Sequence, residues 1–318
     1  MDPIEDDDPN QEQTDPDNSE EEEEEETDDE QSNNHEAVRM YMFGHSLVDI
    51  EIENSPRKDE GKIGYWIYLL SQQNNQSFTY TGQWGFLGGH AGSLPPISAW
   101  GSEIIPSVWD SDLAPFSDAN FNSILITPGN FMQWRPANTP DPNDNNHSLL
   151  TKTEILMDWT NTQEEDGMKF YIYENWPDMA PFLTNEQFPA TAQQFSNYNN
   201  HTMGEFHDWW LEYYDFIRSS RPDAHVKLIP VGSIISKIFE NHLDTTIPSS
   251  ELYVDDAPHG TATIYFLAGL TSYMGIYNTK APSNFNVPDT IHSEVRDNYN
   301  DIVDFIWNEL NQFYNSQD

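Results

Sequence analysis

The sequence contains no cysteine among its 318 residues. This absence excludes disulfide bonds, thiolate nucleophiles and zinc sites with cysteine ligands. Long apolar runs are also missing, since no stretch approaches the roughly 20 apolar residues of a membrane-spanning helix. The ten histidines form no His-Glu-x-x-His motif, and His201 and His207 are too far apart for one helix turn. We therefore expect no metal site and no transmembrane segment.

Basic residues are scarce. Against 13 Lys and Arg stand 55 Asp and Glu, which gives a formal net charge of -42. Residues 1–36 hold 19 of the acids and no base, so the remaining 36 acids still outnumber all 13 bases. Nucleic-acid binding is disfavoured, because that affinity comes mainly from clustered Lys and Arg that neutralise phosphates. A neutral or cationic partner is easier to accommodate.

The first 36 residues differ in composition from the rest of the chain and include an unbroken run from Glu20 to Glu26. A segment so poor in apolar residues cannot bury enough surface to fold, so we expect 1–36 to be a disordered tail, either a tether or a solubilising arm. The folded domain is then 37–318. No basic region and apolar segment follow Met1, so no signal peptide is expected. The protein is expected to be cytoplasmic, or extracellular or at the cell surface if a leader was removed.

After the tail, apolar runs alternate with amphipathic stretches, as in βα units around a mostly parallel sheet. Five strands and four helices are predicted. The strands are expected at 38–43, 77–81, 123–127, 169–173 and 226–231, and the helices near 62–71, 204–218, 261–274 and 292–313. This pattern predicts a single doubly wound α/β domain, in which reactive groups collect at the carboxyl ends of the strands.

Four of the predicted strand ends and loops carry side chains or glycines that could take part in acyl transfer. Ser46 follows the first strand, Gly85 the second and Asn130 the third, and Asp256 and His259 lie just before a late helix. Taken singly, each has an ordinary structural interpretation as a turn residue or a helix cap. Their order and their shared position at strand ends favour a common site.

The chemistry explains why these residue types belong together. A serine hydroxyl is a weak nucleophile until an imidazole removes its proton, and a carboxylate on the other ring nitrogen fixes the tautomer. Asp256, three residues before His259 on a turn that contains proline, could supply that carboxylate. The oxyanion of the tetrahedral intermediate needs donors, which could be the amides of Ser46 and Gly85 and the side chain of Asn130.

These segments resemble the conserved blocks of the SGNH or GDSL-type hydrolases, in the same order along the chain. Residues 44–47 (Gly-His-Ser-Leu) are similar to the first block, with His where Asp is usual. Residues 82–85 are similar to the second, residues 128–131 (Pro-Gly-Asn-Phe) to the third, Gly-x-Asn-Asp, and residues 256–259 to the fifth, Asp-x-x-His. The resemblance covers most of the folded chain, and its departures from the pattern leave the catalytic residue types in place.

The resemblance implies a flavodoxin-like three-layer α/β/α sandwich and an esterase that uses neither metal nor organic cofactor. It implies Ser46, Asp256 and His259 as the triad, with Ser46, Gly85 and Asn130 as the oxyanion hole. The substrate is then a small-molecule or glycan ester. The alternative function is a carbohydrate-binding protein on the same fold that holds a glycan without turnover.

Three tryptophans favour a carbohydrate substrate. Trp84, Trp134 and Trp176 all follow strand ends, where aromatic faces could stack on sugar rings. We therefore expect them to contact the substrate. Neither the acyl group nor the alcohol of the ester follows from the sequence.

Overall fold

The computed structural model describes residues 37–52, 55–142, 144, 146–164, 167–243 and 246–317. The predicted tail, 1–36, lies outside these residues. The strands are β1 (Val38–Gly44), β2 (Phe78–Trp84), β3 (Ser123–Ile126), β4 (Lys169–Tyr173) and β5 (His225–Ile229). The helices are α1 (Ile63–Gln73), α2 (Leu87–Gly92), α3 (Leu149–Asn161), α4 (Ala192–His201), α5 (His207–Ser220), α6 (Val231–Lys237), α7 (Ser249–Leu252), α8 (Ala262–Tyr277), α9 (Ser293–Asp297) and α10 (Tyr299–Asn315).

The five strands form one parallel sheet in the order β2-β1-β3-β4-β5. The chain passes from β1 to β2 on one side and then returns to place β3 on the other side of β1. The connections therefore diverge between β1 and β3, and in open α/β sheets the crevice outside the strand ends at such a point is where ligands bind. This confirms the predicted α/β class and a sheet of five parallel strands.

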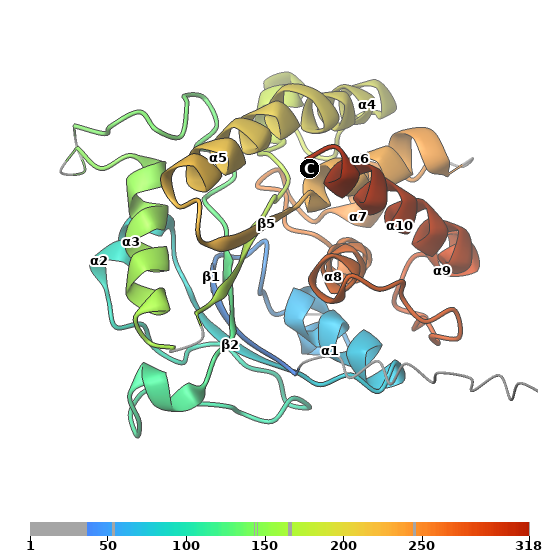
Figure 1. Cartoon of the computed structure of the whole chain (residues 1–318). Helices are drawn as coiled ribbons and strands as arrows, with labels where there is room; N and C mark the ends of the chain where they lie inside the picture. The colour runs from blue at the N-terminus through green and yellow to red at the C-terminus, as the bar shows by residue number, and fades with distance from the viewer. Residues whose placement is uncertain are drawn as a thin grey trace, which may run out of the picture. The chain divides into compact units, whose positions relative to one another are not determined.

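Helices cover both faces of the sheet (Figure 1). Along β1, Met40 and Met42 pack into the core beneath α1 and α8, whereas Tyr41 and Phe43 pack into the core beneath α3 and α5. Successive side chains of a strand point to opposite faces, so a strand covered on both sides is apolar at every position. That requirement explains why the strands were readable as short apolar runs.

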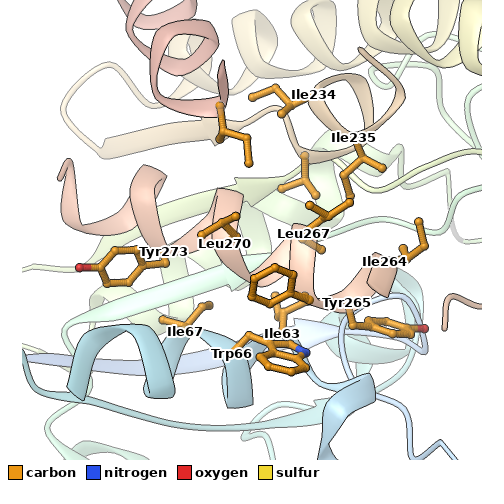
Figure 2. Close-up of a cluster of buried hydrophobic side chains, with 14 of the residues drawn as sticks. Ile63, Trp66, Ile67, Ile234, Ile235, Ile264, Tyr265, Leu267, Leu270 and Tyr273 are labelled. Carbon is orange, nitrogen blue, oxygen red and sulfur yellow. The ribbon is translucent and has the colours of Figure 1, made fainter. Parts of the chain in front are cut away.

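On the face of the sheet that carries Met40 and Met42, α1 packs against α8, as Figure 2 shows. Trp66 of α1 lies against α8, and a Cβ added at Gly269 would come within 2.4 Å of the Trp66 Cβ. Only glycine permits that approach. α8 is buried along its whole length, as expected for a helix that is apolar on all sides.

The predicted helix at 292–313 is two helices, because the chain breaks at Asn298 between α9 and α10. α2, α3, α4, α6 and α7 were not predicted. α4 is rich in Asn, which is a weak indicator of a helix, and a capping box between Thr191 and Gln194 closes its first turn.

Short helical turns complete the described chain. They are η1 (Lys58–Gly61), η2 (Phe116–Ala119), η3 (Ala180–Phe182) and η4 (Thr184–Glu186), and the π-helical turns η5 (Thr202–Phe206) and η6 (Ile238–His242). Among the described residues, no helix is long and apolar enough to cross a membrane.

Candidate active site

The turn after β1 presents Ser46 at the carboxyl edge of the sheet. Gly44 is required there, because a Cβ at this position would lie 2.9 Å from Val48 Cγ2. The His45 carbonyl then accepts the Val48 amide at 2.8 Å and closes the turn. The Tyr265 hydroxyl, from the first turn of α8, donates to the Ser46 carbonyl at 2.8 Å. The backbone of Ser46 is thereby held on two sides while its side chain stays partly exposed.

A second loop, between α7 and α8, brings an imidazole to this serine. His259 Nε2 lies 2.8 Å from Ser46 Oγ, and His259 Nδ1 lies 2.7 Å from Asp255 Oδ2. A carboxylate accepts hydrogen bonds, so the proton of the neutral imidazole resides on Nδ1. Nε2 is then the acceptor for the Ser46 hydroxyl. The three side chains form a continuous hydrogen-bonded chain from carboxylate to hydroxyl.

The acid in this chain is Asp255, one residue earlier than the predicted Asp256. Asp255 Oδ1 accepts the amides of Ala257 at 3.1 Å and His259 at 2.9 Å, so its side chain closes the turn that carries the histidine. Asp256 makes a backbone contact instead: its carbonyl accepts the Met179 amide at 2.9 Å. The preference of Asp for capping a turn two to four residues ahead was the signal that could have separated the two neighbours.

Trp176 braces this loop and does not face a substrate. It is 1% exposed, and its Nε1 donates to the Pro258 carbonyl at 2.9 Å. The prediction that it stacks on a sugar is therefore wrong. The other two tryptophans are open to solvent, Trp84 at 59% and Trp134 at 75% exposed.

The prediction that the Gly85 amide stabilises an oxyanion is also wrong. That amide donates to the Gly44 carbonyl at 2.8 Å and so extends the β1–β2 pairing by one residue. The other two predicted oxyanion donors are still free to donate a hydrogen bond. Within the part of the chain that the structure describes, neither the Ser46 amide nor the Asn130 side chain makes a hydrogen bond. Asn130 follows β3, on the other side of the point where the connections diverge, and is 9% exposed.

A buried polar cluster ties the loops that carry Ser46 and Asn130 to each other. The Asn175 amide donates its two hydrogens to the Pro128 carbonyl at 2.7 Å and to Thr127 Oγ1 at 3.0 Å. His45 Nε2 lies 3.2 Å from the same carbonyl. The side-chain amide of Asn175 has only two hydrogens, and because both are already donated it cannot also donate to His45 Nε2. The Leu47 amide approaches His45 Nδ1 at 3.4 Å, so Nδ1 is the acceptor. Nε2 therefore carries the proton of the ring and donates to the Pro128 carbonyl.

His45 is a neutral side chain in this cluster. Burial lowers its pKa to about 4, although the hydrogen bond to Pro128 acts in the opposite direction. Sequence reasoning identified His45 only as a departure from the family motif. Its partner Asn175 is distant in sequence and gave no signal.

One large hollow lies away from these residues. It measures about 890 Å³ and lies at the amino end of β5, the edge of the sheet opposite Ser46. Its basic side chains are engaged: Lys227 Nζ donates to the Gly275 carbonyl at 2.8 Å, and Arg221 pairs with Asp158 at 2.6 Å. Among the described residues, no group of three or more His, Asp or Glu side chains is placed to hold a metal ion.

Comparison of the sequence with protein-family models and with curated proteins finds no match. Among solved structures, the chain is similar to a DUF4886 family protein from Bacteroides uniformis, with 11% identity over 86% of this chain and 94% of that chain, at a TM-score of 0.49. It is also similar to LAE5, an alpha/beta hydrolase from the metagenome of Lake Arreo, with 11% identity over 77% of this chain and 99% of that chain, at a TM-score of 0.42. A third likeness is to a mutant of Axe2, an acetyl-xylooligosaccharide esterase from Geobacillus, with 10% identity over 81% of this chain and 99% of that chain, at a TM-score of 0.43.

Proposed function

We propose that this protein is a serine ester hydrolase with Ser46 as nucleophile, His259 as general base and Asp255 as the orienting acid. One observation carries the proposal: the hydrogen-bonded chain of 2.8 Å from Ser46 Oγ to His259 Nε2 and 2.7 Å from His259 Nδ1 to Asp255 Oδ2. Such a chain activates a hydroxyl that is otherwise a weak nucleophile. A protein that merely held a glycan would gain nothing from it.

In this mechanism His259 takes the proton from Ser46 as its oxygen attacks the ester carbonyl carbon. The tetrahedral intermediate collapses as the imidazolium returns the proton to the departing alcohol, which leaves an acyl group on Ser46. Water, deprotonated by the same imidazole, then attacks the acyl-enzyme and releases the acid. Asp255 stays ionised throughout and stabilises the imidazolium in both steps.

Two donors are available for the negative charge that develops on the carbonyl oxygen. The Ser46 amide and the Asn130 side chain have no other partner among the described residues and follow the two strands, β1 and β3, that flank the binding crevice. Donors fixed in place before the reaction stabilise the transition state without reorganisation, and removal of one such donor typically lowers kcat by about 10²–10³.

Within this class we propose a carbohydrate ester as substrate. Four exposed aromatic side chains lie at the end of β2 or on the loops after β2 and β3, namely Trp84, Phe86, Phe131 and Trp134. Three of them form a continuous surface, because the Phe86 ring packs edge-on against Trp84 at 5.5 Å and against Phe131 at 5.2 Å between centroids. An open aromatic surface beside a nucleophile suits a sugar ring, which presents one apolar face.

The test is hydrolysis of p-nitrophenyl acetate, with Ser46→Ala as the decisive variant. We expect kcat to fall by about 10⁶, as for other nucleophiles of this type, with the melting temperature unchanged. Ser219→Ala, at an exposed position on α5 far from the site, is the matched control and should keep full activity. If Ser46→Ala retains more than a few per cent of the turnover, this serine is not the nucleophile. Acetylated glycans, compared with simple acyl esters of increasing chain length, then test the carbohydrate assignment.

A further inference from the structure

We propose that a cavity beside Asn130 is a subsite for a positively charged group of the substrate, an ammonium or quaternary ammonium. This inference rests on the proposed function and names a feature of its substrate. The cavity measures about 520 Å³, within the range of small-molecule sites, and its walls include Asn130, Phe131, Trp134, Asp178, Phe182 and Glu205.

The cavity adjoins the reacting groups on two sides. Asn130, one of the two free donors, forms part of its wall. Asp178 forms another part, and the next residue, Met179, donates its amide to the Asp256 carbonyl at 2.9 Å. The loop that carries Asp255 and His259 is therefore bonded directly to the wall of the cavity. A substrate whose ester lies at Ser46 can extend into this space.

Aromatic rings supply one of the two features that bind an organic cation. Phe131 is 50% exposed and Trp134 is 75% exposed, and Phe182 lines the same space. The face of an aromatic ring is negative and attracts ammonium groups. The Trp134 ring already has a guanidinium, that of Arg135, 4.8 Å from its centroid. Arg135 is itself paired with Asp141 at 2.7 Å, so its charge is largely compensated.

Carboxylates supply the other feature. Asp178 and Glu205 line the cavity, and no Lys or Arg does. His201 Nδ1 lies 3.7 Å from Glu205 Oε2. This histidine adds no positive charge at neutral pH, because burial lowers its pKa although the charge of Glu205 acts in the opposite direction. Burial raises the pKa of Asp178, and the nearby charges of Asp256 and Asp255 raise it further. A bound cation would relieve this repulsion, whereas a carboxylate, phosphate or sulfate would increase it.

The backbone around the cavity is irregular. η5 joins α4 to α5 through a π-helical turn in which Gly204 leaves the helical region, at φ -104° and ψ -110°. This turn places Glu205 and Phe206 on the cavity wall, and His201, the last residue of α4, lies there as well. Such turns are rare and are frequently found at functional sites.

Two matched esters test the proposal, acetylcholine and 3,3-dimethylbutyl acetate, which share a shape and differ in one positive charge. At low ionic strength we expect kcat/KM to be about tenfold higher for acetylcholine. The preference should decline with added salt, because part of it is Coulombic. In the double variant Asp178→Asn, Glu205→Gln the ratio of the two kcat/KM values should fall to about twofold or less, and this ratio cancels any loss that the two esters share. Glu212→Gln, an exposed acid on α5, removes one charge elsewhere and should leave the preference intact.

Equal kcat/KM for the two esters overturns the proposal, as does a preference that survives in the double variant. Failure of the proposed function looks different, since then neither ester is hydrolysed in a manner that depends on Ser46. In that event calorimetric titration with tetramethylammonium still tests the subsite. Binding that weakens in Asp178→Asn supports it, and the absence of binding to the wild-type protein overturns it.

Discussion

At the scale of single residues, two adjacent aspartates show that a shift of one position decides which carboxylate contacts His259. Asp255 and Asp256 have the same chemistry, the same loop and similar partial burial. They differ in their contacts: Asp255 Oδ2 lies 2.7 Å from His259 Nδ1, whereas the contact of Asp256 is through its backbone carbonyl, which accepts the Met179 amide on the neighbouring loop. Only the first can fix the tautomer of the imidazole.

We expect Asp255→Asn to lower kcat for p-nitrophenyl acetate by about 10⁴ with little change in fold. The amide keeps the shape but can present a hydrogen to Nδ1, which favours the wrong tautomer of His259. Asp256→Asn is the matched control and should stay within a few-fold of the wild-type kcat. Steady-state kinetics on the two variants distinguishes the two aspartates. A large loss of kcat in Asp256→Asn with a small one in Asp255→Asn would mean that Asp256 is the orienting acid.

At this scale the sequence predicted residue types better than it predicted contacts. Ser46 and His259, which the sequence predicted to act together at the edge of the sheet, lie within hydrogen-bond distance of each other. Asp256 and Gly85 were misplaced because side-chain direction and backbone pairing depend on the turn that forms. Trp176 was misplaced for a different reason: a tryptophan after a strand fits a binding surface or a buried brace equally well, and only burial distinguishes the two.

At the scale of elements, the site depends on the distance between the loops that follow β1 and β3. These loops carry Ser46, the proposed nucleophile, and Asn130, and the Pro128 carbonyl connects them by accepting from both His45 and Asn175. Thr127 extends the connection to β4 by donating to the Tyr173 carbonyl at 2.8 Å. The cluster therefore holds the loop of the proposed oxyanion donor against the loop of the proposed nucleophile.

We expect His45→Ala to lower kcat by about 10–100-fold while KM changes little, because small displacements of a positioned group are costly in the transition state. His45→Gln should recover most of the loss, since its amide can donate from nearly the position of Nε2. His45→Asp should not recover it, although Asp is usual here in the family that the motif resembles, because a carboxylate would face the Pro128 carbonyl. A rise in KM at constant kcat in His45→Ala would make this residue a substrate contact instead.

Strands were more predictable than helices in this chain, and the sheet explains why. β1, β3 and β4 are covered on both faces and therefore read as apolar runs. The helices that were found, such as α1 and α8, bury large apolar faces. α4 buries Phe195, Tyr198 and Asn199 among polar residues, and tertiary contacts and its capping box determine that it is a helix.

At the scale of the whole molecule, charge is the property that sets this chain apart, and buried titratable groups act on its stability in opposite directions. His45 and His90 are both held neutral, because burial lowers the pKa of each from 6.5 to about 4. Between about pH 4 and pH 6.5 these histidines are therefore protonated in the unfolded chain but not in the folded protein. Each histidine therefore makes the protein less stable as the pH falls from about 6.5 towards 4.

Asp49 changes the stability with pH in the direction opposite to that of the two histidines, and this effect can be tested. The residue is 8% exposed, and burial raises its pKa from 3.8 to about 7, although the positive charge of Lys62 counteracts the shift. Lys62 compensates only in part, because its ammonium bonds to Asp59 Oδ1 at 2.9 Å and to the Gly101 carbonyl at 2.8 Å. The folded protein thus binds a proton between about pH 3.8 and 7 that the unfolded chain does not. Stability is lost as the pH rises through this window, by up to about 4 kcal/mol above pH 7.

Asp49→Asn removes the titrating group and keeps an oxygen that can accept from the Tyr80 hydroxyl, which lies 3.3 Å from the carboxylate. We expect the variant to be more stable than the wild type at pH 8, by a few kcal/mol in the free energy of unfolding, and the difference to approach zero near pH 4. Urea denaturation of both proteins at pH 4, 6 and 8 measures the difference directly. Because every other acid is present in both proteins, the comparison isolates this carboxylate from the net charge of the rest. If the difference in the free energy of unfolding stays constant across the three pH values, Asp49 is ionised throughout. In that case the burial of this carboxylate does not make the stability depend on pH.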